Sequence, residues 1–300
     1  MSSHAAYRGR FAPTPSGPLH LGSLYTALAS YLAARAAGGQ WLLRIDDLDG
    51  PRCEPGAAEQ ILQQLAAHGL RADEPPRWQS AHLAEYQQAL NALQQQQLIY
   101  ACRCSRRQLR AQASAQSSAA DGSAIYPGSC RELGLADRNT ALRIKLAARK
   151  VSLDDDWQGP VQRDLQSELG DFVVRRRDGM IAYQLACVVD EQAQGISHVV
   201  RGADLLDSSI CQTQIAQYLG FPAIRYGHLP VLQDAGGAKL SKQHHAPPLD
   251  SAHAADNLRR CLELLRQVTP PPTLRLPDRI LEFALGNWRP QAIAGTGIRI

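Results

Sequence analysis

The stretch YRGRFAPTPSGPLHLGS, residues 7–23, decides the fold of this 300-residue chain. Residues 7–11 have the pattern of a short strand, and the prolines and glycine within 13–18 force an irregular loop after it. A helix rich in alanine and leucine is expected over 24–36, where Gly38-Gly39 ends it. A helix that starts directly after such a loop presents backbone N–H groups and a positive dipole end, which favours binding of a phosphate.

Strands and helices alternate along the chain beyond this stretch. The alternation predicts an α/β fold with a parallel sheet. The expected elements are strands at 41–45, 182–189 and 196–201, helices at 55–69, 205–219 and 255–268, and a helical face formed by Leu83, Tyr86, Leu90 and Leu93.

The composition is that of an ordinary globular chain, with 44% apolar and 20% charged residues and a net charge of +4. This length predicts two domains, or one large domain with an insertion. The sequence has no run of 18 apolar residues and no apolar leader, so we expect neither a membrane span nor a signal peptide. Seven cysteines, an odd number, suit reduced thiols or a metal site in the cytoplasm.

The positive charge is concentrated in the middle of the chain. Residues 102–177 hold 14 Lys and Arg against 9 Asp and Glu, a net +5, while the rest of the chain has a net −1. On charge alone, a solvated surface and a footprint for a phosphate backbone are equally good interpretations. The Ala/Ser-rich stretch 111–124 predicts a mobile surface loop, with a poorly packed helix as the alternative.

A second basic motif, KLSKQ at 239–243, follows the Gly236-Gly237 turn. Lysines on both sides of a serine can hold phosphate oxygens as point charges. Alone, this motif is more simply an exposed basic loop, and the histidine of HLGS at 20–23 is more simply a structural residue. Together, the two motifs resemble the HIGH and KMSKS signatures of class I aminoacyl-tRNA synthetases. The ATP-binding set that the resemblance implies is His20, Gly22, Ser23, Lys239, Ser241 and Lys242.

Three further blocks narrow the resemblance. GRFAPTPSG at 9–17, RIDDLD at 44–49 and VRGADLL at 200–206 look like the glutamyl and glutaminyl subgroup, with Asp46 where that subgroup usually has Glu. The closest resemblance is to the family of glutamyl-Q tRNA(Asp) synthetases, short paralogues of glutamyl-tRNA synthetase. It runs from about 7 to 248, with a fainter echo at Asn287-Trp288-Arg289.

The resemblance implies the Rossmann-like parallel sheet of class I synthetases, with an inserted zinc-containing subdomain and a small C-terminal helical region. The chain ends about fifty residues after its KMSKS-like motif, so we expect a catalytic body without an anticodon-binding domain. The expected parts are the first half of the catalytic domain at 1–99, the inserted zinc and acceptor-binding subdomain at 100–178, the second half of the catalytic domain at 179–245 and the helical region at 246–300.

The family also implies a two-step reaction. Glutamate and ATP with Mg²⁺ give glutamyl-adenylate and pyrophosphate without tRNA, and glutamate then passes to queuosine at the first anticodon position of tRNA(Asp). The implied partners are ATP, L-glutamate and the anticodon loop that bears queuosine, and a monomer is expected. No covalent nucleophile is needed, because catalysis rests on positioning and electrostatics.

Matching residues take their roles from the resemblance. The planar fork of Arg10 suits the side-chain carboxylate of glutamate, although alone it reads as a surface ion pair. Asp46 would accept from the substrate ammonium, with a water or a shifted substrate filling the missing methylene. His20 and Lys242, the expected catalytic pair, would stabilise charge on the phosphates. The expected glutamate-binding set is Arg10, Phe11, Ala12, Pro13, Thr14, Asp46, Tyr183 and Arg201.

Cys102, Cys104 and Cys130 form a candidate zinc cluster, because thiolates suit tetrahedral Zn²⁺. The C-x-C spacing is not the usual C-x₂-C knuckle, and no histidine lies between residues 102 and 130. In the family, the tyrosine that matches Tyr126 supplies the fourth ligand, so one structural Zn²⁺ held by these four residues is implied. The alternative is three reduced surface thiols.

Two other functions stay open at this point. The chain could be a truncated glutamyl-tRNA synthetase that charges tRNA(Glu), although the missing anticodon region argues against it. It could also be a catalytically idle tRNA-binding module that kept the fold. Retention of His20, Gly22 and Lys242 argues against an idle module, which has no need for phosphate chemistry at both motifs.

Overall fold

A seven-stranded sheet forms the centre of the computed structural model, which describes residues 6–112, 125–147, 149–233, 247–293 and 297–299. The strand order is β3-β2-β1-β9-β10-β6-β7, and neighbours pair in parallel except β6 and β7, which form a hairpin. The predicted α/β fold with a mostly parallel sheet is confirmed. Its strands are β1 Arg8–Phe11, β2 Gln40–Ile45, β3 Arg77–Trp78, β6 Lys150–Asp155, β7 Gly159–Asp164, β9 His198–Gly202 and β10 Arg225–Leu229.

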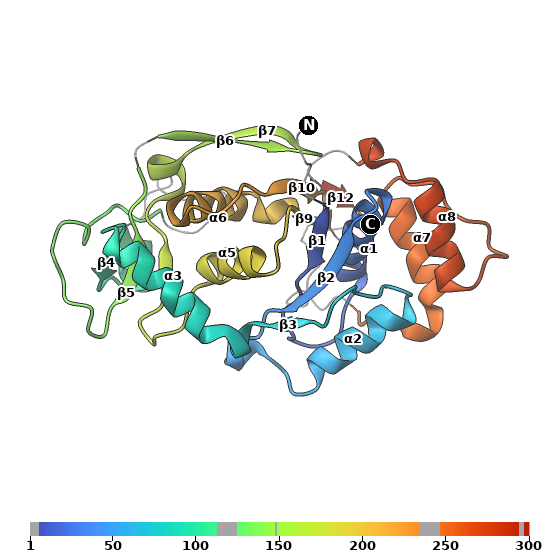
Figure 1. Cartoon of the computed structure of the whole chain (residues 1–300), viewed down its shortest axis with the longest axis horizontal. Helices are drawn as coiled ribbons and strands as arrows, with labels where there is room; N and C mark the ends of the chain where they lie inside the picture. The colour runs from blue at the N-terminus through green and yellow to red at the C-terminus, as the bar shows by residue number, and fades with distance from the viewer. Residues whose placement is uncertain (1–5, 113–124, 148, 234–246, 294–296, 300) are drawn as a thin grey trace.

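Helices cover both faces of this sheet (Figure 1), with α1, α2, α7 and α8 on one side and α3, α5 and α6 on the other. Trp41 and Leu43 of β2 belong to one hydrophobic core, while Leu42 between them belongs to the other. A strand buried on both faces reads as a continuous apolar run, as β2 does. The helices are α1 Leu21–Ala36, α2 Ala57–Ala67, α3 Leu83–Gln95, α5 Tyr183–Ala193, α6 Leu206–Leu219, α7 Ala254–Leu264 and α8 Pro277–Gly286.

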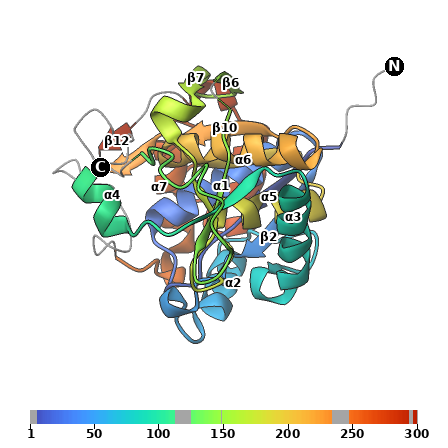
Figure 2. The same cartoon turned by 90° about the vertical axis from the view of Figure 1, so that its left-hand side faces the viewer.

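The middle of the chain builds a separate three-stranded antiparallel sheet of order β4-β5-β8. β6 and β7 come from the same part of the chain but extend the central sheet beside α6 (Figure 2). The domain boundaries expected from the resemblance stay a prediction. The remaining elements are β4 Ile99–Cys102, α4 Arg106–Gln112, β5 Ala141–Ile144, β8 Val173–Arg175, and the paired strands β11 Val231–Gln233 and β12 Gly297–Arg299.

The prediction of a strand at 182–189 is wrong, because this segment begins helix α5. Seven consecutive residues of α5, Leu185–Glu191, are buried, and the helix contacts both α3 and α6. A helix buried all round shows no 3.6-residue period, so its short apolar run cannot be told from a strand. Of the expected helical face, Tyr86, Leu90 and Leu93 are buried, whereas Leu83 begins its helix and is 56% exposed.

The other predicted elements are confirmed to within a few residues. Helix α1 begins at Leu21, three residues earlier than expected, because His20 caps it. Residues 113–124 of the Ala/Ser-rich stretch and the motif at 239–243 lie outside the described residues. Within the described part of the chain, no helix is long and apolar enough to cross a membrane.

Gln64 of α2 joins the loop just before α1 to a distant part of the chain near residue 249. Its side-chain oxygen accepts from the Leu19 N–H at 2.8 Å, and its amide donates to the Leu249 carbonyl at 2.8 Å. The Leu249 N–H also donates to the Leu19 carbonyl at 2.8 Å. Gln64 is 5% exposed, so water has little access to these bonds. The loop before α1 is thus held against the chain that follows residue 246.

Gln64→Leu is expected to lower the free energy of unfolding by about 2 kcal/mol, because two buried backbone groups lose their partners. Urea denaturation measures this loss. The control is Gln63→Leu at an exposed position of the same helix, where a change below about 0.5 kcal/mol is expected. Equal stabilities of the two variants would contradict the bridging role of Gln64.

Candidate active site

A cavity of about 480 Å³ opens at the carboxyl ends of β1, β9 and β10, beside the start of α1. Ligands of parallel α/β sheets bind at this edge. Most of the residues expected to bind glutamate and ATP meet here: Arg10, Phe11, Ala12, Pro13, Thr14, His20, Gly22, Ser23, Tyr183 and Arg201. Asp46 lies in an adjoining cavity, while Lys239, Ser241 and Lys242 fall outside the described residues.

His20 caps helix α1 at this cavity. Its Nδ1 accepts from the Gly22 N–H at 3.1 Å. Because Nδ1 accepts, the neutral ring carries its proton on Nε2, which is then a donor. The first turn of this 16-residue helix contains no acidic residue. The positive end of the helix dipole and the imidazole donor therefore make this part of the cavity suited to an anion.

Arg10 of β1 is buried, so its interpretation as a surface ion pair is wrong. Its Nη2 donates to Glu191 of α5 at 2.8 Å, and neither side chain exposes more than 4% of its area. The Arg10 Nε has no hydrogen-bond partner among the described residues. The ion pair fixes one nitrogen of the guanidinium toward α5 and leaves a buried donor on another.

Arg201 of β9 is the second buried cation of the cavity. Its Nη2 donates to Ser209 Oγ at 2.6 Å and to Gln212 Oε1 at 2.7 Å. In the part of the chain that the structure describes, its Nε and Nη1 have no partner. An unsatisfied buried donor costs about 1–3 kcal/mol. The unpaired nitrogens of Arg10 and Arg201 therefore indicate a site for an anionic ligand such as a carboxylate.

Arg44 and Asp190 extend the buried charges beside this cavity. Arg44 Nε donates to Asp46 Oδ1 at 2.6 Å, and its nitrogens lie 3.7 Å from Asp190 and 3.8 Å from Glu191. Arg77 Nε lies 2.7 Å from the other oxygen of Asp190. Burial raises the pKa of Asp46 above its ordinary value, despite the opposing charge of Arg44. Each buried carboxylate in the group thus has a guanidinium neighbour, as burial requires.

A second cavity, of about 950 Å³, adjoins the first, and the linings of the two share Thr14, Arg52 and Tyr183. Tyr183 is 41% exposed, so it stands at an open boundary rather than in the core. The charged residues that line the second cavity are Asp46, Asp49, Arg52, Arg143, Arg176, Arg177 and Asp178.

Sequence reasoning missed Asp190, Glu191 and Arg52. The first two close the apolar run LACVVDE, and a carboxylate inside a buried segment needs a cationic partner. That signal was available. The sequence gives no such signal for Arg52. It lies at the junction of the two cavities, and that position depends on the whole fold.

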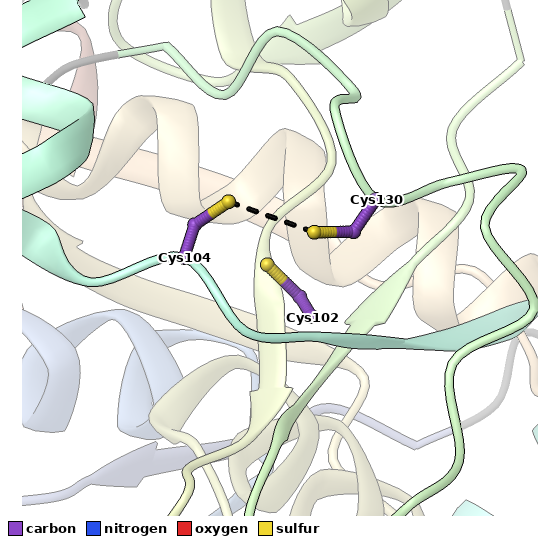
Figure 3. Close-up of side chains that lie close together, drawn as sticks. All are labelled: Cys102, Cys104 and Cys130. Carbon is purple, nitrogen blue, oxygen red and sulfur yellow. Dashed lines mark hydrogen bonds between the residues drawn. The ribbon is translucent and has the colours of Figure 1, made fainter.

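Cys102, Cys104 and Cys130 come together beside β4 (Figure 3). Their sulfur atoms lie within 4.8 Å of one another, and those of Cys104 and Cys130 are 3.6 Å apart. All seven cysteines of the chain are free thiols. Cys102 and Cys130 are buried, so the interpretation as surface thiols is wrong for these two. The cluster could hold a metal ion.

Tyr126 adds an oxygen to this cluster. Its hydroxyl lies 3.5 Å from Cys102 Sγ and accepts from the Cys130 N–H at 2.7 Å. Arg143 Nε lies 3.3 Å from Cys102 Sγ. Although burial raises it, hydrogen bonds from Tyr126 and its neighbours lower the pKa of Cys130 to about 7. Three sulfurs and one oxygen give four potential donor atoms, the coordination number of structural Zn²⁺ sites.

Comparison with known proteins places this geometry in a family. The family described as "tRNA synthetases class I (E and Q), catalytic domain" matches residues 6–266. The glutamyl-Q tRNA(Asp) synthetase of Acinetobacter baylyi is 44% identical over 286 residues, which are 95% of this chain and 94% of that protein. The protein of the same name from Burkholderia mallei is 52% identical over 250 residues, 82% and 84% of the two chains.

Solved structures agree on the fold. A glutamate tRNA ligase from Elizabethkingia meningosepticum, in complex with its amino acid, matches with a TM-score of 0.78 and 24% identity. The match covers 98% of this chain and 67% of that protein. At this identity the likeness shows a shared fold.

Glu191→Gln is expected to lower the free energy of unfolding by about 3 kcal/mol, because it leaves a buried cation without its counter-charge. Urea denaturation measures the loss. Glu59→Gln removes the same charge from an exposed helix position and is the matched control, with an expected change below about 0.5 kcal/mol. A loss for Glu191→Gln no larger than that of the control would contradict the importance of the ion pair.

Proposed function

The chain belongs to the class I tRNA synthetases for glutamate and glutamine, and within them to the glutamyl-Q tRNA(Asp) synthetases; from this premise we propose that it activates glutamate with ATP and transfers it to queuosine of tRNA(Asp). As a member of this family it is a ligase. The observation that carries the proposal is the pair of buried arginines, Arg10 and Arg201, with unsatisfied donors at a cavity beside a helix N-terminus.

The first step joins glutamate to ATP. An α-carboxylate oxygen of glutamate attacks the α-phosphorus, a new C–O–P bond forms, and the bond to the β-phosphate breaks as pyrophosphate leaves. Mg²⁺ bound with ATP would neutralise charge on its phosphates. The protein's contribution is to align the two reactants and to stabilise the charge that develops.

Glutamate is held at the arginine end of the cavity. Arg10 and Arg201 receive its carboxylate oxygens, because their unsatisfied nitrogens are donors only. Asp46 accepts from the substrate ammonium and Tyr183 closes the site toward the second cavity. Both oxygens of Asp46 already accept from Arg44, at 2.6 and 3.3 Å, so the ammonium would be an additional partner. Phe11, Ala12, Pro13 and Thr14 line the same cavity as the two arginines.

The ATP phosphates are held at the helix end of the cavity. His20, Gly22 and Ser23 lie there, and His20 is a donor through Nε2. The chain that leads to Lys239, Ser241 and Lys242 departs from Val231 and Leu232 at the cavity. The chain that follows them pairs Pro248 with His20. Both flanks thus support a role for these residues in binding the triphosphate.

The second step uses the adjoining cavity. A hydroxyl of the queuosine cyclopentenediol attacks the carbonyl carbon of glutamyl-adenylate, an ester forms and AMP leaves. The 950 Å³ cavity opens onto Tyr183 at the glutamate site and carries Arg176 and Arg177 for phosphates of the RNA loop. These two arginines lie at the C-terminal end of the 102–177 segment, in which the positive charge of the chain is concentrated.

We further propose that the cysteine cluster holds one structural Zn²⁺, with Cys102, Cys104, Cys130 and the oxygen of Tyr126 as ligands. Arg143, near Cys102, favours thiolates over thiols. Bound zinc would tie the end of β4 to the segment that carries Tyr126 and Cys130. Cys104 and Arg143 both line the second cavity, so this tie supports the wall of the acceptor site.

Comparing acceptors tests the function most simply. With radiolabelled glutamate and ATP, tRNA(Asp) that contains queuosine is expected to be labelled at least about a hundredfold faster than the same tRNA lacking it, because only the modified base offers the cyclopentenediol nucleophile. Label on tRNA(Glu) at its 3′ end would identify a tRNA(Glu)-charging enzyme instead. Absence of glutamate-dependent ATP–pyrophosphate exchange would identify an idle binding module.

Metal analysis tests the zinc proposal. Protein purified without added zinc is expected to contain about one equivalent per chain, and Cys104→Ser is expected to lose most of it, because a ligand is removed. Cys53→Ser changes a thiol that is not in the cluster and is expected to keep its zinc. Zinc near zero in the unmodified protein, unchanged by Cys104→Ser, would remove the site.

A further inference from the structure

A chain of buried hydrogen bonds leads from Arg201 into the protein. Arg201 Nη2 lies 2.6 Å from Ser209 Oγ, Ser209 Oγ lies 2.7 Å from His228 Nε2, and His228 Nδ1 lies 2.5 Å from Asp155 Oδ2. Ser209, His228 and Asp155 come from α6, β10 and β6 and are at most 6% exposed. None of these three residues lines the cavity that holds Arg201.

The carboxylate sets the direction of this chain. Asp155 Oδ1 accepts backbone N–H groups of Trp157, Gln158 and His228 at 2.9–3.0 Å. Although burial raises it, the hydrogen bonds from His228 and these backbone groups hold the pKa of Asp155 below its ordinary value. An ionised carboxylate only accepts, so His228 Nδ1 carries a proton and donates it to Oδ2.

The imidazole then orients the serine. Burial lowers the pKa of His228, which keeps the ring neutral and its Nε2 an acceptor. Ser209 O–H therefore donates to Nε2, since its alternative acceptor, the Leu205 carbonyl, is farther away at 3.2 Å. With its proton directed to His228, the Ser209 oxygen presents lone pairs to Arg201.

Tyr226 and Gln212 restrict the plane of the Arg201 guanidinium. The guanidinium lies over the Tyr226 ring, 5.3 Å from its centroid, and the His228 ring is stacked with the Tyr226 ring at a centroid distance of 5.9 Å. Gln212 accepts from the same Nη2 as Ser209 does. Both bonds engage Nη2, so Nε and Nη1 are the nitrogens left for a ligand.

A Ser-His-Asp set could suggest a nucleophilic serine, but this one cannot reach a substrate. Ser209 is fully buried and lines none of the cavities formed by the described residues around the site. Its oxygen is also occupied by the Arg201 cation. The set is built to hold a group in place rather than to attack.

We propose that Asp155, His228 and Ser209 form a one-directional hydrogen-bond relay that positions Arg201 to bind a carboxylate of glutamate. The relay rests on the proposed function, and its members are positioning residues that act through Arg201. Their role is therefore specific to glutamate binding and does not extend to the ATP end of the cavity.

Asp155→Asn tests the direction of the relay. The new amide oxygen can keep the three backbone bonds of Oδ1, while its NH₂ faces His228 Nδ1 and forces the ring proton onto Nε2. Nε2 would then donate to Ser209, in competition with Arg201. The KM for glutamate in ATP–pyrophosphate exchange is expected to rise at least about fivefold, while kcat and the KM for ATP change less than about twofold.

Ser209→Ala is a second test that leaves His228 and Asp155 in place, and the same selective rise in the KM for glutamate is expected. Ser209→Thr keeps the hydroxyl and is expected to restore the KM to within about twofold. Gln214→Ala is the matched control: Gln214 is buried on the same helix but bonds Arg149, so this variant is expected to leave the KM for glutamate unchanged.

The outcomes separate the relay from the function. An active wild type whose Asp155→Asn and Ser209→Ala variants keep the KM for glutamate within twofold would overturn the relay alone. If Asp155→Asn does not fold, Ser209→Ala decides. A rise in both KM values together with a fall in kcat, shared by Gln214→Ala, would show a general structural effect and also overturn the relay. A wild type without glutamate-dependent exchange would overturn the proposed function and the relay with it.

Discussion

The ion pair between Arg10 and Glu191 is the interaction on which the rest of the site depends. Each charge is tolerable away from water because an opposite charge is beside it. Arg10 belongs to β1 and Glu191 to α5, so the pair holds this helix against the sheet. Arg44 of β2 lies 3.8 Å from the same carboxylate and binds Asp46, so two strands and one helix share one charged network.

Under the proposed function, the buried arginines of this cavity give it its selectivity for the amino acid. Arg10 and Arg201 offer the ligand only hydrogen-bond donors, because every nitrogen of a guanidinium is a donor. A ligand group with two acceptor oxygens and a negative charge satisfies them, whereas a primary amide would place an N–H against one of them. The opposite end of the cavity, at His20 and the start of α1, also favours an anion. Under the proposed function, one cavity would hold a carboxylate and a phosphate side by side, which is what formation of a mixed anhydride needs.

Much of this site could be predicted from the sequence, because its motifs lie where strands meet loops. The strand, loop and helix at 7–36, and the pair Cys102 and Cys104 at the end of β4, are local patterns whose geometry follows from neighbouring residues. Helix α5 could not be predicted in the same way. Its residues 185–191 are all buried and show no helical period, and although a carboxylate in an apolar run signals a cationic partner, only the fold identifies that partner of Glu191 as Arg10, some 180 positions earlier. The partners of Arg201 likewise come from α6 and β10, which only the tertiary structure brings to it.

The central claim is that buried guanidinium donors select the carboxylate of the amino acid. ATP–pyrophosphate exchange with L-glutamate and with L-glutamine, measured as kcat/KM under the same conditions, tests it most directly. We expect a preference for glutamate of at least about a hundredfold, roughly 2.7 kcal/mol, because the glutamine amide sets a donor against a donor and lacks the charge. Equal kcat/KM values for the two amino acids would contradict the claim.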